Sequence, residues 1–187
     1  MITKCNEHYK HYNFDIKYGN AMDSLLFEPI QFTHIMCMFY TFYYMPNQED
    51  FLRNCNKWLR FNGYLIVHLV DRNRFHPIVP PSEIFGVPIQ TFAKKGDRIT
   101  KSAVSFKGFK YESKYEDNHE NNSAKFTEVV TDDNSGNVRK NVHALTMRSL
   151  DDYAKMFKQT GFEMKKVINL THVRYHYQYL YILQKVK

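Results

Sequence analysis

Three polar side chains stand near the ends of apolar runs, where they could take part in chemistry. His68 lies close to the end of the run Tyr64–Val70. Its imidazole, with an ordinary pKa near ~6.5, could accept a proton from an amine or a hydroxyl group. Tyr43 lies at the end of an earlier run, and Arg72 follows His68 by four residues. The competing interpretations, a hydrogen-bonded core histidine and a tyrosine packed beneath a loop, stay open at this stage.

The sequence indicates neither a metal site nor several familiar kinds of catalysis. Its cysteines, Cys5, Cys37 and Cys55, form no CxxC pair, so we expect reduced, mostly buried thiols rather than disulfides or a zinc site. It contains no GxxxxGK[ST] loop, no GxSxG nucleophile motif and no HExxH metal motif, which are the signatures of phosphate binding, of serine hydrolases and of zinc proteases. We therefore predict no bound metal.

The segment Phe32–Val70 predicts a strand, a helix and a second strand that form one parallel crossover unit. The run Phe32–Tyr44 is nearly continuously apolar, as expected for a parallel strand that helices cover on both faces. The run Tyr64–Val70 is similar and rich in branched residues, and Asn62-Gly63 provides a turn before it.

The helix between these strands has a clear start and one apolar face. Asn47 would cap its N-terminus, and Glu49 and Asp50 would follow in the first turn, where the helix dipole favours negative charge. One stripe of side chains would lie against the sheet: Phe51, Leu52, Cys55, Trp58 and Leu59.

The rest of the chain predicts further helices, a loop and antiparallel strands. Before the crossover we expect a helix over Ile2–Tyr12 and a short strand over Asn13–Tyr18, and after it a proline-rich loop over Asp71–Thr100. Period-two patterns then predict three antiparallel strands within Ser105–Met147. The last elements are a helix from Ser149 that Gly161 ends, followed by strands over Phe162–Leu170 and Tyr175–Val186.

Length and composition suit one folded domain. The chain has 187 residues, of which 43% are hydrophobic, enough to bury a core. The formal charge is +7, but basic residues are scattered among acidic ones, so nucleic acid is not expected as a partner. No apolar run approaches the ~18 residues that span a bilayer, and no signal peptide is evident, so we expect a cytoplasmic protein without membrane contact.

Four segments in this order resemble class I S-adenosylmethionine-dependent methyltransferases of the small-molecule type. Gly19–Ala21 is similar to the turn after the family's third strand, and Phe32–Ile35 resembles the entry to its fourth. Leu59–Leu65 resembles the LKPGGYL segment before the fifth strand, and Thr160–Phe162 the turn before the last two. The resemblance implies an α/β fold with a Rossmann-like sheet, in which residues 1–187 form one domain and 101–147 an inserted antiparallel lid.

The family's glycine-rich loop, and the acidic residue that holds the cofactor ribose, have no counterpart here. The seven glycines include no GxG. We therefore expect an N-terminally incomplete sheet: a fragment, a truncated product or a degenerate relative. Without the family's first two strands, one sheet edge would stay unpaired, and a protein partner or a second copy would have to cover it.

The resemblance also implies site residues and an activity. The cofactor S-adenosylmethionine would contact Asn20, Ala21, Met22, Met38, Phe39 and Tyr40. The acceptor would contact Tyr43, His68 and Arg72, with His68 and Tyr43 as catalytic residues. The predicted reaction is methyl transfer to the amine or hydroxyl of a small molecule, which the absent loop would impair. The alternatives are a noncatalytic interaction module and an RNA methyltransferase.

Overall fold

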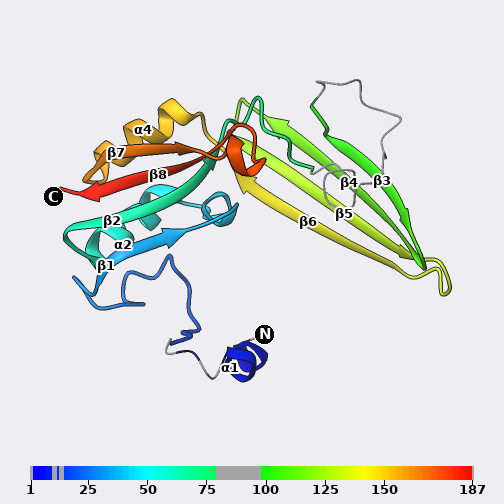
Figure 1. Cartoon of the computed structure of the whole chain (residues 1–187), viewed down its shortest axis with the longest axis horizontal. Helices are drawn as coiled ribbons and strands as arrows, with labels where there is room; N and C mark the ends of the chain where they lie inside the picture. The colour runs from blue at the N-terminus through cyan, green and yellow to red at the C-terminus, as the bar shows by residue number, and fades with distance from the viewer. Residues whose placement is uncertain (1, 10–11, 13–14, 79–97, 187) are drawn as a thin grey trace.

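The structure, a computed structural model, describes residues 2–9, 12, 15–78 and 98–186. Its strands form two four-stranded sheets (Figure 1): sheet A in the order β1-β2-β8-β7 and sheet B in the order β3-β4-β5-β6. The strands of sheet A are β1 (Phe32–Cys37), β2 (Leu59–Val70), β7 (Phe162–Asn169) and β8 (Gln178–Lys185). Those of sheet B are β3 (Lys101–Phe106), β4 (Phe109–Asn118), β5 (Ser123–Asp132) and β6 (Val138–Thr146).

The parallel crossover unit is present as predicted. Strands β1 and β2 are parallel neighbours, with Ile35 opposite Leu65. A 3-10 helix, η1 (Thr41–Tyr44), and helix α2 (Gln48–Trp58) connect them. The side chain of Asn47 accepts a hydrogen bond from the backbone N–H of Asp50, which confirms the N-cap.

Helix α2 leads into β2 without a loop, because Trp58 ends the helix and Leu59 begins the strand. The predicted turn at Asn62-Gly63 is therefore an irregularity inside the strand, and the register of β1 against β2 shifts between Phe32 and His34. Asn62 has a left-handed φ of 60°, a conformation that asparagine tolerates better than most residues.

The C-terminal part of sheet A also follows the sequence pattern. Ser149 caps helix α4 (Leu150–Gln159) by accepting a hydrogen bond from the Asp152 N–H. Gly161 has a φ of 86°, which favours glycine, and turns the chain into β7. Strand β8 then inserts antiparallel between β2 and β7. Sheet A therefore combines one parallel pair of strands, β1 with β2, with two antiparallel pairs.

Sheet A buries one face more completely than the other. The core combines Leu65, Val67 and Leu69 of β2 with aromatic side chains of η1 and α4. On the opposite face His34 is exposed and Met36 is 61% exposed. The prediction that helices cover both faces of β1 is therefore wrong for the described residues, because both described helices of this region, α2 and α4, contribute to the same core.

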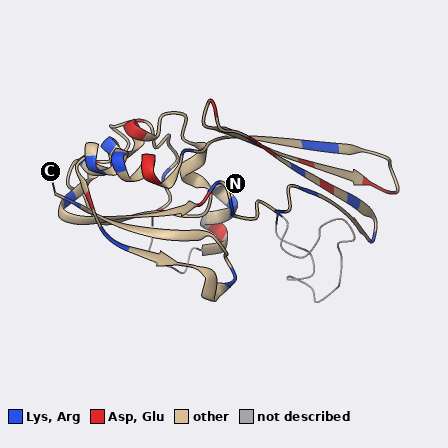
Figure 2. Cartoon of the chain, turned by 90° about the horizontal axis from the view of Figure 1, so that it is seen from above, with Lys and Arg blue, Asp and Glu red and all other residues tan. Residues whose placement is uncertain are grey.

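Sheet B has four strands rather than the three that the sequence predicted. The additional strand β3 pairs antiparallel with β4. It was missed because only Val104 of its six residues is buried, so it lacks a period-two apolar pattern. The sheet extends away from sheet A as a long arm (Figure 1). Lys and Arg segments on this arm and on α4 stand beside Asp and Glu segments (Figure 2).

The N-terminal segment differs from its prediction. Helix α1 (Ile2–Tyr9) confirms the first eight residues of the predicted helix Ile2–Tyr12. Residues 10 and 11 lie outside the described part, and Tyr12 is not helical. Residues 15–18 of the predicted strand Asn13–Tyr18 are not in a strand, and the other two lie outside the description. Most of the predicted loop Asp71–Thr100 also lies outside it. None of the described helices is long and apolar enough to cross a membrane.

One buried amide joins the elements around η1. Gln48 is 3% exposed, and its Nε2 donates to the carbonyl oxygens of Phe42 at 3.1 Å and Thr146 at 2.9 Å, and to the Tyr153 hydroxyl at 3.1 Å. It thereby links η1, the end of β6 and helix α4 to the first turn of α2.

Gly63 allows β1 to approach β2 closely, and we predict that Gly63→Ala destabilises the protein. An added Cβ would lie 2.8 Å from the Arg60 carbonyl oxygen and 2.9 Å from that of Thr33. Both are backbone atoms, so the strands must move, at a cost of about 1–3 kcal/mol. Asn62→Gly is the matched control, because its φ suits glycine. Urea unfolding measures both, and equal stability of the two variants would contradict the prediction.

Candidate functional site

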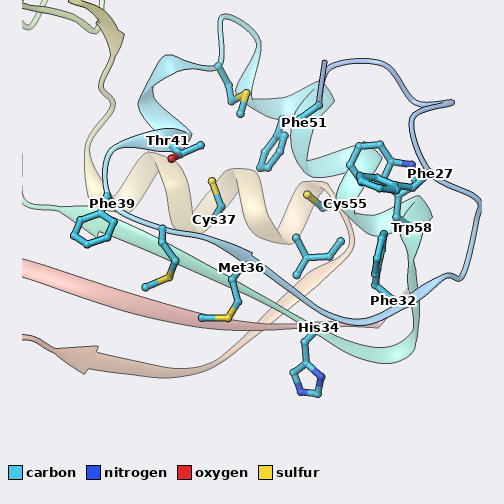
Figure 3. Close-up of a pocket in the computed structure, with 14 residues that line it drawn as sticks. Phe27, Phe32, His34, Met36, Cys37, Phe39, Thr41, Phe51, Cys55 and Trp58 are labelled. Atoms are coloured by element: carbon cyan, nitrogen blue, oxygen red, sulfur yellow. The ribbon is translucent and has the colours of Figure 1, made fainter. Parts of the chain in front are cut away.

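An open apolar cavity of about 590 Å³ lies between β1, its carboxyl end and the inner face of α2. Figure 3 shows Cys37 and Cys55 facing the cavity from the strand and from the helix, while His34 and Met36 point away from α2. In open α/β sheets, ligands bind beyond the carboxyl ends of the parallel strands. The position of this cavity is therefore that of a ligand site. Burial raises the pKa of Cys37 to about 12, so its thiol stays protonated.

The turn that contains Asn20, Ala21 and Met22 lies against α2, but only Ala21 lines the cavity. Asn20 is engaged locally, because its Oδ1 accepts a hydrogen bond of 3.0 Å from the Met22 N–H. Asn54 of α2 donates to the Ala21 carbonyl oxygen at 3.1 Å. Met22 packs against the core. The structure thus places one of these three predicted cofactor contacts at the cavity.

The carboxyl end of β1 contributes Met38 and Phe39 to the cavity. Phe39 is 61% exposed and has a φ of 53°, a left-handed conformation that is costly for an aromatic residue. Strain of this kind occurs often at functional sites. Tyr40, the third predicted cofactor contact in this segment, instead lines a second cavity on the side of sheet B.

The first cavity fits the apolar parts of a nucleoside-sized ligand better than its polar parts. Ligand pockets commonly measure about 300–1,000 Å³ and are mostly apolar, with a few polar groups. None of the 14 lining residues is Asp, Glu, Lys or Arg. The described residues therefore provide surfaces for an adenine ring and a thioether chain, but no carboxylate for ribose hydroxyls.

Tyr43 is a core residue in this structure. It is 1% exposed, and its hydroxyl oxygen accepts a hydrogen bond of 2.7 Å from the Val70 N–H. Burial, together with the neighbouring Tyr153, raises the pKa of Tyr43 well above its usual range. The phenol stays protonated, and it fixes the end of η1 to the end of β2.

His68 lines neither cavity, but its ring is close to one aromatic ring of each. Its ring centroid is 6.1 Å from that of Phe39, which lines the first cavity, and 6.3 Å from that of Tyr40, which lines the second. The residue is 3% exposed, and its Nε2 has no hydrogen-bond partner among the described residues. Burial lowers the pKa of His68, although contacts with Gln178 and the Phe39 backbone oppose the shift. The neutral imidazole keeps a lone pair that could accept a proton.

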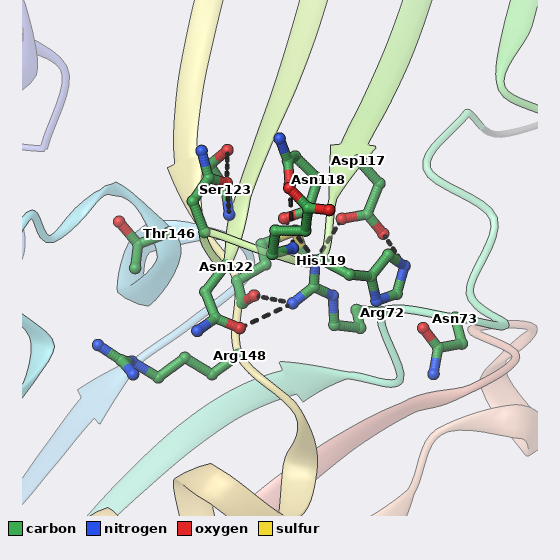
Figure 4. A network of polar contacts seen from close by, with 12 residues as sticks. Arg72, Asn73, Asp117, Asn118, His119, Asn122, Ser123, Thr146 and Arg148 are labelled. Carbon is green, nitrogen blue, oxygen red and sulfur yellow. Dashed lines mark hydrogen bonds and ion pairs between the residues drawn. The ribbon is translucent and has the colours of Figure 1, made fainter.

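Arg72 joins the two sheets through a buried polar network (Figure 4). Its guanidinium forms an ion pair with Asp117 and donates to the Met147 carbonyl oxygen. It also donates to Asn122 Oδ1 at 3.1 Å and to the Asn118 carbonyl oxygen at 3.2 Å. The Arg72 side chain is 5% exposed. It would have to leave these partners in order to contact a substrate.

A polar chain that the sequence did not indicate lies at the second cavity. Glu128 of β5 and His143 of β6 lie 3.0 Å apart (Oε2 to Nε2). The other ring nitrogen of His143 is 2.7 Å from the Tyr44 hydroxyl, and the Tyr111 hydroxyl donates to Glu128 Oε1 at 2.6 Å. Period-two patterning places these strand residues on one sheet face, but only the strand register and the position of η1 bring them together.

Comparison with known proteins shows the fold. No family model matches the chain, and no curated protein matches its sequence. Solved structures do match. An S-adenosylmethionine-dependent methyltransferase from Clostridium acetobutylicum has a TM-score of 0.69 at 9% identity, over 98% of this chain and 70% of that one. The CcbJ methyltransferase from Streptomyces caelestis has a TM-score of 0.67 at 10% identity, over 90% and 62%.

A third match is the sugar N-methyltransferase KedS8 from Streptoalloteichus, with a TM-score of 0.58 at 16% identity over 98% of this chain and 67% of that one. The chain thus spans roughly two thirds of the length of these proteins. The α/β fold, with its parallel crossover and reversed last strand, is that of S-adenosylmethionine-dependent methyltransferases.

The low pKa of His68 predicts a pH dependence of stability. The unfolded chain binds a proton at His68 near pH ~6.5, whereas the folded chain binds it only at lower pH. The neutral His68 side chain therefore contributes to the free energy of unfolding above that range, and this contribution is lost as the pH falls through the lowered folded-state pKa. We expect His68→Gln to reduce the loss of unfolding free energy between about pH 8 and about pH 5. Identical pH profiles for wild type and variant would contradict this assignment.

Removing the Arg72 guanidinium should strongly destabilise the protein. Arg72→Met leaves the Asp117 carboxylate buried, with only Arg98 at 4.0 Å and His119 at 3.3 Å to compensate. We expect a loss of about 3–5 kcal/mol in thermal or urea unfolding. Adding Asp117→Asn should recover part of it, because the buried charge is then gone. Arg53→Met is the control, since its ion pair with Glu49 is exposed and should contribute less than about 1 kcal/mol.

Proposed function

We propose that the protein transfers a methyl group from S-adenosylmethionine to a small-molecule acceptor with an amine or hydroxyl group. One observation carries the proposal: the apolar cavity lies beyond the carboxyl end of β1 in a sheet of order β1-β2-β8-β7. The similarity of the whole described fold to methyltransferases, including a sugar N-methyltransferase, supports it.

Ala21, Met38 and Phe39 would hold the cofactor in the first cavity. Bound there, the sulfonium would supply an electrophilic methyl group. The chain itself would exclude water with its apolar surfaces and orient the acceptor. His68, neutral and next to both Phe39 and Tyr40, would accept the proton that the acceptor loses. Residues 101–147 would act as the lid over the acceptor.

The surroundings of Tyr43 and Arg72 in the structure favour different roles from those that the sequence predicted. Both side chains are buried and hydrogen-bonded to other parts of the chain. We propose that they act as positioning residues, Tyr43 for η1 and Arg72 for sheet B, rather than as contacts of the acceptor.

Calorimetry with S-adenosylhomocysteine tests cofactor binding. We expect binding weaker than submicromolar, because none of the described residues that line the cavity carries a carboxylate. Phe39→Ala should weaken it by about tenfold, equivalent to about 1.4 kcal/mol. Phe61→Ala is the matched control: Phe61 is equally exposed, at 68%, but does not line the cavity. Absence of binding by the wild type, or equal effects of the two variants, would count against the proposal.

A noncatalytic interaction module is the second candidate. β1 is the outermost strand of sheet A, and Met36 and Phe39, each 61% exposed, present an apolar surface beside it. An unpaired apolar edge favours association. Sedimentation that shows a concentration-dependent oligomer, together with no binding of S-adenosylhomocysteine, would favour this candidate.

A further inference from the structure

The second cavity, of about 180 Å³, lies between the segment that includes η1 and the inner face of sheet B. A cavity of about 150 Å³ is large enough to hold a benzene ring, so this one can take a six-membered ring. Aromatic side chains form most of its walls: Tyr40, Tyr44, Phe75, Tyr115 and Phe126.

Among the described residues that line this cavity, Glu128 is the only acidic one. Burial acts to raise its pKa, but hydrogen bonds from Tyr111 and His143, the charge of a protonated His143 and a hydrogen bond from Asn141 together outweigh burial, so the pKa of Glu128 is lowered and the carboxylate is ionised. Its side chain is 25% exposed. An ionised carboxylate can accept about four hydrogen bonds, so Glu128 can accept another donor.

The partners of Glu128 leave its charge uncompensated when His143 is neutral. Because the carboxylate only accepts, the hydrogen of neutral His143 belongs on Nε2, and Nδ1 accepts from the Tyr44 hydroxyl. Burial, followed by the charge of Glu128, raises the pKa of Tyr44, so this phenol also stays neutral. Among the described residues, no lysine or arginine forms an ion pair with Glu128.

We propose that this cavity binds a small organic amine in its ammonium form, with Glu128 as the counter-charge and the aromatic rings as walls. Ammonium groups are attracted both to carboxylates and to the faces of aromatic rings. His143 and Tyr111 are positioning residues that hold the carboxylate. The further assignment of this amine as the methyl acceptor rests on the proposed function.

The position of the cavity suits that assignment. Phe39 lines the first cavity and Tyr40 the second, and the two rings flank His68. Because Phe39 and Tyr40 are consecutive in the chain, an amine beside Tyr40 would lie next to the proposed cofactor cavity. The ring centroid of His68 is 6.3 Å from that of Tyr40.

A purely structural role for the Tyr44–His143–Glu128 chain makes a different prediction. It would tie η1 to sheet B, so its variants would change stability but would not change selectivity among ligands. Cyclohexylamine and cyclohexanol distinguish the two roles, because they share one ring and differ in charge.

The experiment is an NMR titration of the full chain with each of these probes. We expect cyclohexylamine to shift the ring resonances of Tyr44 and His143 and to bind about tenfold more tightly than cyclohexanol. Glu128→Gln should abolish the preference and leave cyclohexanol binding unchanged. Glu128→Asp should retain the preference. Glu116→Gln, which removes an exposed carboxylate of the same sheet, should have no effect.

Equal affinity of the wild type for the two probes, no shift at Tyr44 and His143, or an unchanged preference in Glu128→Gln would overturn the proposal. If Glu128→Gln does not fold, the preference of the wild type for cyclohexylamine and the residues whose resonances shift still test the proposal. Other results would reject the proposed function without rejecting the amine site. Amine binding without binding of S-adenosylhomocysteine would retain the amine site and reject methyl transfer, and the reverse result would reject only the amine site.

Discussion

The buried guanidinium of Arg72 determines how the two sheets are held together. It extends from the end of β2 and contacts the β4–β5 hairpin and the connection from β6 to α4. A charge removed from water is costly unless it is paired, so the ion pair of Arg72 with Asp117 favours one arrangement of the sheets. The second cavity exists because of that arrangement, since its walls come from η1 on one side and from β4, β5 and β6 on the other.

Local signals in the sequence predict much of sheet A. The Asn47 and Ser149 caps, the apolar stripe of α2 and the glycine at 161 act within a few residues, so they can be identified without knowledge of the fold. The parallel pairing of β1 with β2 follows from the short crossover between them. Sheet B was predicted less well, because edge strand β3 buries so little that its pattern is weak.

Long-range contacts explain most of the differences at the site. Tyr43 and Arg72 are residue types that often bind ligands. Their roles here depend on Val70 and Asp117, partners that are distant in the sequence and that only the fold brings close. In the chain from Tyr44 to Glu128, the contact between Tyr44 and His143 joins residues 99 positions apart in the sequence, which no local pattern can reveal. Ala21, Met38 and Phe39 line the cavity. They could be predicted because the family resemblance carries spatial information that residue chemistry alone lacks.

The segment from Phe39 to Tyr44 is a single short connection that forms a wall of both cavities. Its strained start and its hydrogen-bonded end are only five residues apart. A ligand that displaces this segment from one side must do work against a ligand on the other. Thermodynamic linkage then requires that each occupant change the affinity of the other by the same factor, so the order of loading would not alter the final equilibrium.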